Sequence, residues 1–306
     1  MAAVLAQQYP RFEVLIVDNG SRDARASEVA ARYGVQYVGE PDGGLSRARN
    51  RGAREAPPTG VVAYIDDDAI PEAGWLEGLC AEFTDPRVMA VTGRILPIRL
   101  DTEGARMCAA MGVLDGGPRR IAVDRDTVHW FDLLREGLGG GANMAVRSRA
   151  FAVWPGFDPR LGLGGALRAG EEDYALFSLV KRGHRVVYTP SAVVRHPFPA
   201  TAAELRAMHL RTLTTGAAYL AFLFAQEPEC RHAIGQHLLR RLPRSRRRSF
   251  SRAPAEARRL ASAWREAWAG LTGVGLFARS VLETSVRRRS ESLAGRAFHT
   301  GRPDDA

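Results

Sequence analysis

Acidic residues follow two short apolar runs of the sequence, a position in which carboxylates can hold a cation. Asp18 ends one run, and three consecutive aspartates, Asp66, Asp67 and Asp68, follow a second run at 61–65. In an open parallel sheet, ligands bind beyond the carboxyl ends of the strands, so we expect these acids to meet in one cleft. Adjacent carboxylates repel one another unless a cation or donors neutralise them. Oxygen ligands suit Mg²⁺ or Mn²⁺, often together with substrate phosphates, so the pattern indicates a metal–diphosphate site.

The segments around these acids alternate between strand-like and helix-like patterns. Strands are expected at 12–17, 35–38, 61–65, 88–98, 143–146 and 185–188. Helices are expected at 21–33, with Ser21 as its cap, at 45–55, from Pro71 onward, at 171–182, and from a capping box at 201–204. This alternation is typical of an α/β fold with crossover helices between parallel strands. The segment 156–170 holds five glycines and is expected to be a loop.

Positive charge is concentrated in the last quarter of the chain. Residues 231–306 contain 17 arginines and six acidic residues, a net charge of +11, whereas the whole chain carries +9. The first 230 residues therefore carry −2. Arginine runs at 246–248, 258–259 and 287–289 alternate with Leu, Trp and Phe, which favours amphipathic helices on an anionic membrane surface. A solvated basic face and binding to nucleic acid are the alternatives.

Several classes of protein are excluded by composition. Three cysteines without metal-type spacing argue against a disulfide framework and against a structural zinc site. The longest apolar run, at 213–225, is shorter than the roughly 20 residues that span a bilayer. The N-terminus has no signal-peptide pattern. We therefore expect a cytoplasmic location, with peripheral attachment to the inner face of a membrane through the basic tail.

Six short motifs occur in a fixed order along the first two thirds of the chain. They are FEVLIVDNGSRD at 12–23, GLSRARNRG at 44–52, YIDDD at 64–68, GGANMAVR at 140–147, GFD at 156–158 and GEED at 170–173. Their order and spacing resemble those of the family 2 glycosyltransferases. The resemblance implies a GT-A-type fold, with a mostly parallel sheet flanked by helices. It also implies transfer of a sugar from a nucleotide diphosphate donor to an acceptor hydroxyl, with inversion at the anomeric carbon.

The resemblance assigns the donor nucleotide to two segments. Asp18 resembles the aspartate that reads the nucleotide base, and Asn19 lies beside it. Arg47 and Arg49 resemble the segment that borders the nucleotide pocket, where a guanidinium could meet base or phosphate. A capping role for Asp18 and solvent-facing positions for the arginines are the alternatives.

The aspartate triplet resembles the DXD motif of the family. Asp68 is expected to contact a divalent metal, Mn²⁺ or Mg²⁺, directly, and Asp66 to contact the ribose or the metal. Asp67 is expected at the donor nucleotide as well. Alternation along an extended segment puts Asp66 and Asp68 on the same side. His196 follows the last predicted strand, where relatives often place a histidine that touches the metal or the diphosphate.

An inverting transfer also needs a carboxylate that takes the proton of the acceptor hydroxyl. Asp173 is the candidate base, and a shift of one residue in the motif would make Glu172 that base. The alternative is that these acids only favour the N-terminus of a helix through its dipole. Gly140, Gly141 and Asn143 are expected near the donor sugar or acceptor, because glycines let a ligand approach the backbone, although this segment could form only a turn.

The start of the chain departs from the family pattern. Relatives begin with an additional strand and a loop that help to hold the nucleotide, and residues 1–9 resemble only the end of the helix that follows them. The sheet is therefore expected to lack its first strand, which leaves the strand at 12–17 without a neighbour on one side. Either the start is assigned too late or the protein is an incomplete copy without activity.

The sequence thus predicts a glycosyltransferase domain at 1–200 and an arginine-rich helical region at 201–306. The expected partners are a nucleotide-sugar donor, a divalent metal, and an acceptor that is a glycan, a lipid-linked sugar or a small molecule, as in the synthesis of cell-envelope polysaccharides. An anionic membrane surface is a further expected partner, and specific nucleic acid is not. The alternatives are a nucleotidyltransferase, which has no evident use for 172–173 as a base, and a non-catalytic binding protein at a membrane, favoured by the missing strand.

Overall fold

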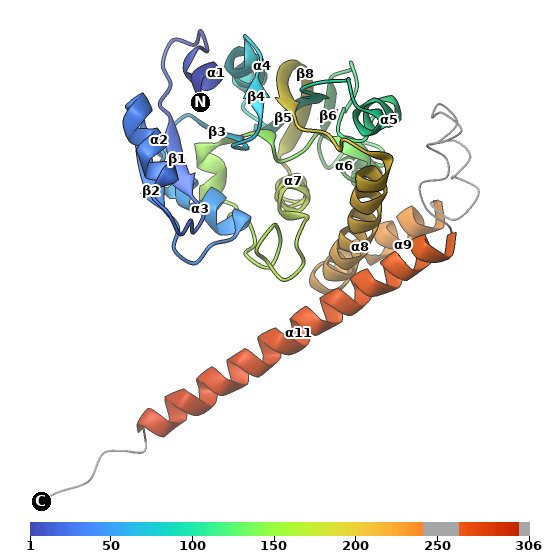
Figure 1. The fold of residues 1–306 in the computed structure, drawn as a ribbon. Helices are drawn as coiled ribbons and strands as arrows, with labels where there is room; N and C mark the ends of the chain where they lie inside the picture. The colour runs from blue at the N-terminus through green and yellow to red at the C-terminus, as the bar shows by residue number, and fades with distance from the viewer. Residues whose placement is uncertain (241–262, 300–306) are drawn as a thin grey trace, which may run out of the picture.

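The computed structural model describes residues 1–240 and 263–299, and the strands of this part of the chain form two sheets (Figure 1). The smaller sheet pairs β1 (Leu15–Asp18) with β2 (Gln36–Gly39) in parallel. The larger sheet has the order β3-β7-β5-β8-β4, and β6 also pairs with β8. Its strands are β3 (Val61–Ile65), β4 (Ile70–Pro71), β5 (Val88–Pro97), β6 (Ile121–Val123), β7 (Asn143–Arg147) and β8 (Arg185–His196).

The larger sheet is mixed, which corrects the expectation of a mostly parallel sheet. β5 and β8 are parallel, but β7 lies antiparallel between β3 and β5, and β4 and β6 are antiparallel to β8. An apolar run does not reveal the direction of its strand, so the prediction of parallel strands was wrong for β4, β6 and β7. Since β3, β5 and β8 run in one direction, their carboxyl ends still lie at one edge of the sheet.

Helices cover both faces of the larger sheet, which confirms the α/β class. The helices before the C-terminal region are α1 (Ala2–Leu5), α2 (Arg25–Tyr33), α3 (Leu45–Glu55), α4 (Trp75–Ala81), α5 (Glu103–Met111), α6 (Trp130–Gly137) and α7 (Glu171–Lys181). Trp75 of α4 packs on one face and Leu179 of α7 on the other. The neighbours Val186 and Val187 of β8 divide between these two clusters, as the alternation of a strand requires.

The two sheets are not joined by strand pairing. Within the described residues β1 pairs with β2 alone and β3 with β7 alone, in agreement with the expectation that the strand at 12–17 lacks a neighbour on one side. α3 links the sheets instead. Gly52 of α3 leaves room for Val17 of β1, and the Tyr64 hydroxyl of β3 donates a hydrogen bond of 3.2 Å to the carbonyl of Arg49.

Two predicted helix starts lie elsewhere. α2 begins at Arg25 because Ser21 does not cap it; the backbone N–H of Ser21 donates instead to Asp18, at 2.8 Å. α4 begins at Trp75 because Ile70 and Pro71 form β4, which pairs with β8.

The C-terminal region is helical, as predicted, and consists of α8 (Ala202–Gln226), α9 (Arg231–Arg240) and α11 (Ala263–His299). The capping box at Thr201 and Glu204 is confirmed. α11 packs on α8 and then extends away from the body (Figure 1). The arginine runs at 246–248 and 258–259 lie outside the described residues, and the run at 287–289 falls within α11. In the part of the chain that the structure describes, no helix has the length and apolar character needed to cross a bilayer.

Candidate active site

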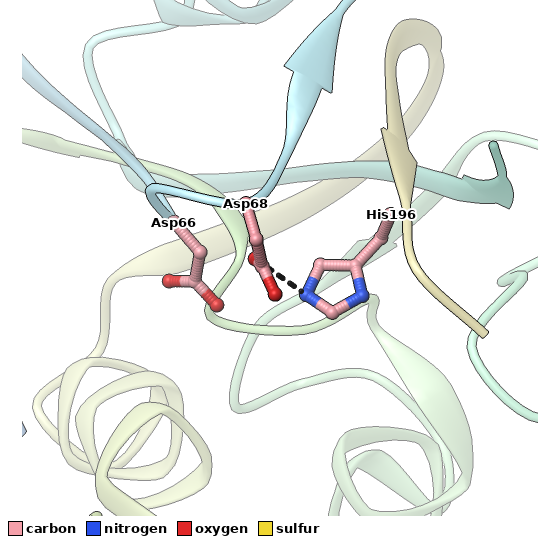
Figure 2. Close-up of side chains that lie close together, drawn as sticks. All are labelled: Asp66, Asp68 and His196. Atoms are coloured by element: carbon pink, nitrogen blue, oxygen red, sulfur yellow. Dashed lines mark ion pairs between the residues drawn. The ribbon is translucent and has the colours of Figure 1, made fainter. Parts of the chain in front are cut away.

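Three predicted metal ligands meet at the carboxyl edge of the larger sheet. Asp66 directly follows β3, and Asp68 lies between β3 and β4. Because β4 pairs Ile70 with Arg195 near the end of β8, it carries Asp68 to His196, the last residue of that strand. His196 Nε2 lies 3.1 Å from Asp68 Oδ1, and Figure 2 shows that Asp66 points into the same space. One ligand atom from each of Asp66, Asp68 and His196 lies within 4.8 Å of the others.

The chemistry of this group fits a hard divalent cation. Two carboxylates and an imidazole can hold Mn²⁺ or Mg²⁺ and leave positions open for phosphate oxygens. Burial raises the pKa of Asp66, and the charges of Arg49 and His196 oppose that shift. His196 Nδ1 lies 2.9 Å from the carbonyl of Pro197; a proton on Nδ1 would leave the Nε2 lone pair for a ligand. Asp67 is exposed and does not belong to this group.

A cavity of about 180 Å³ opens beside Asp66. Its walls come from α3, the end of β3, the turn before β7, the loop at 156–170 and the start of α7. The lining residues are Leu45, Arg49, Asp66, Gly141, Ala142, Leu163, Arg168, Ala169, Glu171 and Glu172. Asp66 therefore belongs both to the metal-ligand group and to the cavity wall.

The glycine-rich loop is held against α3 at three points. The Leu45 N–H donates to the carbonyl of Leu163 at 2.8 Å, and the Ser46 hydroxyl donates to the carbonyl of Leu161 at 2.9 Å. The Asn50 amide both donates to the carbonyl of Phe157 and accepts its N–H, at 2.7 and 2.8 Å. These bonds fix the loop as a wall of the cavity.

Arg49 is buried between the two sides of the cavity. Its Nη1 lies 2.9 Å from Glu171 Oε1 and its Nη2 lies 3.8 Å from Asp66 Oδ1, while its guanidinium stacks over Phe157. Gly141 is needed beside it, since a Cβ there would overlap the guanidinium. Arg49 thus lies within the cavity wall, where its guanidinium lies between Asp66 and Glu171. Arg47 does not line the cavity, and it donates to the carbonyl of Gly43 at 3.3 Å.

Asp18 ends β1 and is buried, but it does not line this cavity. Its Oδ1 accepts the Ser21 N–H at 2.8 Å, and its Oδ2 accepts the Tyr37 hydroxyl at 2.9 Å. The hydrogen bonds from Ser21 and Tyr37 hold the pKa of Asp18 below its usual value. Asn19 is exposed in the following turn, which lies against Gly43 just before α3.

The three acids at the start of α7 have different surroundings because successive helical residues point about 100° apart. Glu171 is buried against Arg49. Glu172 lines the cavity, and its Oε2 is buried without a hydrogen-bond partner among the described residues. Burial and the charge of Glu171 raise the pKa of Glu172 to about 7.

Asp173 lies outside the cavity wall. Its Oδ2 pairs with Arg135 Nη1 of α6 at 2.6 Å, and the guanidinium of Arg135 stacks on the Tyr219 ring of α8 at 4.8 Å. Burial raises the pKa of Asp173, although Arg135 opposes the shift. The Asp173 carboxylate therefore ties α7 to α6 and to the C-terminal helical region.

The glycine-rich turn before β7 contributes one cavity residue, Gly141. Gly140 packs against Ile95 instead. Asn143 is fully buried: its Oδ1 accepts the Trp75 indole N–H at 2.8 Å, and its amide donates to two backbone carbonyls. The structure therefore places Asn143 in the sheet rather than at the cavity.

Sequence reasoning missed Arg168 and Arg135. Arg168 lies in the cavity wall with a left-handed backbone (φ 59°), is exposed, and forms no ion pair in the portion of the chain that is described. It is the one charged residue between 161 and 170, and three acidic residues follow it at the start of α7. A single arginine in an otherwise uncharged loop beside these acids could have been recognised from the sequence as a candidate binding residue. No such indication exists in the sequence for Arg135, because its partner Asp173 is 38 residues away.

Part of the chain is similar to known glycosyltransferases. Residues 1–131 match the model of glycosyl transferase family 2. A pre-mycofactocin glycosyltransferase from Mycobacterium tuberculosis is 32% identical over 190 residues, which cover 60% of this chain and 37% of the relative. A glucosyl-dolichyl phosphate glucuronosyltransferase from Haloferax volcanii is 27% identical over 212 residues, which cover 63% of this chain and 62% of the relative.

The crystal structure of GalNAc-T7 with UDP, GalNAc and Mn²⁺ is 16% identical, with a TM-score of 0.46, covering 72% of this chain and 46% of that chain. The chain spans less than two thirds of the length of each of these relatives. Through the matched segment, residues 1–131, the chain is similar to glycosyl transferase family 2.

Proposed function

We propose that this protein transfers a sugar from a nucleoside diphosphate donor to an acceptor hydroxyl, with inversion. The observation that carries the proposal is the double position of Asp66. It belongs to the group with Asp68 and His196, and it also borders the cavity that contains Glu172. A metal-assisted transfer with a base requires a cation-binding group beside a carboxylate, and the Glu172 carboxylate has one oxygen without a hydrogen-bond partner among the described residues.

Asp66, Asp68 and His196 would hold Mn²⁺ or Mg²⁺. The bound ion would offset the negative charge that develops on the leaving diphosphate. Arg168, which lies in the same cavity wall, would bind the phosphates through its guanidinium. Asp18, held in place by Ser21 and Tyr37, would contact the nucleotide base, and the exposed Asn19 beside it would face the same ligand.

Glu172 would take the proton from the acceptor hydroxyl. A base works best when its pKa lies near the working pH, and burial raises the pKa of Glu172 to about 7. We prefer Glu172 to Asp173 because Asp173 pairs with Arg135 and lies outside the cavity wall. A nucleotidyltransferase would use the metal group but would have no role for Glu172.

The test is release of nucleoside diphosphate from a panel of UDP-, GDP- and dTDP-sugars, with Mn²⁺, with Mg²⁺ and with EDTA. We expect turnover of at least one donor that needs the cation and is abolished by Asp68→Ala. Absence of turnover with every donor would reject the transferase and favour the non-catalytic alternative. Release of pyrophosphate from nucleoside triphosphates and sugar phosphates would favour the nucleotidyltransferase.

We also propose that the region 201–306 holds the domain at 1–200 to the cytoplasmic face of a membrane. The net charge of +11 over residues 231–306 supports attraction to anionic lipid. Attachment at a membrane favours a lipid-linked sugar as the acceptor, as in the synthesis of cell-envelope glycans, and the name of the archaeal relative includes a dolichyl phosphate. The name of the mycobacterial relative, which includes pre-mycofactocin, keeps a small-molecule acceptor as the second candidate.

A further inference from the structure

Among the described side chains of α11, two faces are apolar, and one of them packs against the body. The packed face lies on α8: Ala269 and Ser280 are buried, and Phe277 joins the main core. At Gly273 the two helices touch so closely that a Cβ would overlap the carbonyl oxygen of Thr214. This contact orients α11 and determines which residues point away from the body.

The opposite face carries a row of large apolar side chains that we call the outer stripe. It consists of Trp264, Trp268, Leu271 and Leu282, which are 65–67% exposed. At about 100° and 1.5 Å per residue, these four side chains stay within about 60° of one another and extend over about 27 Å. Four such side chains in a row on a surface mark a site of contact with another apolar phase or molecule.

Basic residues accompany the stripe. Arg265 lies over the Trp264 ring at 5.8 Å, and Arg279, one turn before Leu282, pairs with Glu283 at 2.6 Å. The segment 231–306 that contains the stripe has 17 arginines and six acids. Tryptophan is favoured where water meets lipid, and a helix with an apolar row and many basic residues suits the interface of an anionic leaflet.

We propose that the outer stripe is the part of the protein that enters the membrane, with α11 lying parallel to the bilayer plane. This inference rests on the membrane attachment proposed above and adds to it the surface that inserts. A second copy of the chain is a poorer occupant, because it would bring two segments of charge +11 together. Nucleic acid would engage the arginines and leave the tryptophans and leucines without a role.

The experiment is co-sedimentation of the full chain with vesicles of phosphatidylcholine alone and of phosphatidylcholine mixed with phosphatidylglycerol. The test variant is Trp264→Ser with Trp268→Ser and Leu271→Ser. The matched control is Leu100→Ser with Val128→Ser and Val153→Ser, which changes three apolar residues of the body that are 54%, 77% and 50% exposed. We expect the test variant to lose about tenfold or more of its partition into the mixed vesicles, and the control to keep it.

Quenching of tryptophan fluorescence by brominated lipid gives a second readout. Trp75 and Trp154 are buried in the body and Trp130 packs partly buried against the core, so quenching in the wild type and not in the test variant would locate insertion at the outer stripe. Equal vesicle binding by wild type and test variant would overturn the inference. Absence of wild-type binding would overturn the membrane attachment too, while nucleotide-sugar turnover measured without vesicles would still test the transferase separately. A molecular mass in solution that halves in the test variant would assign the outer stripe to a second copy of the chain. Binding to duplex DNA and not to vesicles would assign the arginines to nucleic acid.

Discussion

Arg49 and Glu171 form an ion pair of 2.9 Å inside the cavity wall, and this pair joins α3 to the first residue of α7. Both side chains are almost completely buried, at 5% and 6% exposed. Because Glu172 is the next residue, the pair also determines where its carboxylate lies. Arg49 additionally reaches toward Asp66, at 3.8 Å, so a single guanidinium connects the metal-ligand group to the residue that precedes the proposed base.

Removing Arg49 should destabilise the whole domain. Arg49→Ala would leave Glu171 buried without its partner, and we expect the free energy of unfolding to fall by about 3–5 kcal/mol in urea titrations. The double variant Arg49→Met with Glu171→Met removes both charges and should recover most of that loss. Equal losses in the single and double variants would mean that the pair matters for its volume and not for its charge.

Glu172 and Asp173 should separate catalysis from stability. Glu172→Gln keeps the size of the side chain and removes the proton acceptor, so we expect kcat to fall about 10²–10⁴-fold with little change in donor KM. Asp173→Asn instead leaves Arg135 without its carboxylate and should lower the unfolding midpoint. A variant pair with the opposite pattern, in which Asp173→Asn folds normally and is inactive, would return the base to Asp173.

The pH profile should report Glu172. Its pKa in the folded protein is about 7, so kcat/KM should rise through neutral pH and level off above it, as the carboxylate form accumulates. A rate that is flat from pH 5 to 9 would contradict this role.

Protonation of Glu172 should also affect stability: as pH rises, the activity should increase but the free energy of unfolding should decrease. Glu172 loses its proton at its usual value of 4.5 when unfolded and near 7 when folded, so the folded state loses stability as pH rises between these values. Glu172→Gln lacks this loss. The free energy of unfolding of the variant minus that of wild type should therefore be larger at pH 8 than at pH 5. The increase should be at most a few kcal/mol, as measured by thermal unfolding at both pH values.

Metal binding can be measured without any substrate. The electron paramagnetic resonance signal of free Mn²⁺ should decrease when wild-type protein is added, and Asp68→Ala and His196→Ala should each weaken this binding at least tenfold. Asp67→Ala is the matched control, because Asp67 adjoins the group without belonging to it. If all three variants bind Mn²⁺ equally, the metal assignment is wrong.

Arg168 should act on the donor rather than on the chemistry of the base. Arg168→Ala removes a charge-assisted contact worth about 1.5–3 kcal/mol, so donor KM should rise about tenfold or more, and UDP or GDP binding should weaken equally. Arg32→Ala removes an exposed arginine of α2 and should change neither quantity. An unchanged KM in Arg168→Ala would exclude the phosphate contact.

The convergence of Asp66, Asp68 and His196 could be predicted because strand ends and motif order are local properties of the sequence. The choice between Glu172 and Asp173 could not, since it depends on which helical residue Arg135 meets across 38 positions. Arg49 and Asn143 illustrate the same limit. Each is of a residue type that often contacts a ligand, yet Arg49 pairs with Glu171 and Asn143 accepts a hydrogen bond from Trp75. These buried contacts result from packing between distant elements, which the sequence does not show.

Gly273 has a consequence for how the molecule could reach an acceptor. Its lack of a side chain allows α11 to cross α8 at contact distance beside Thr214, and α8 in turn contacts the core through Tyr219. Even alanine at this crossing would push the two helices apart and tilt α11 relative to the body. If α11 rests on a surface, the distance and orientation of the cavity relative to that surface therefore depend on residue 273 having no side chain.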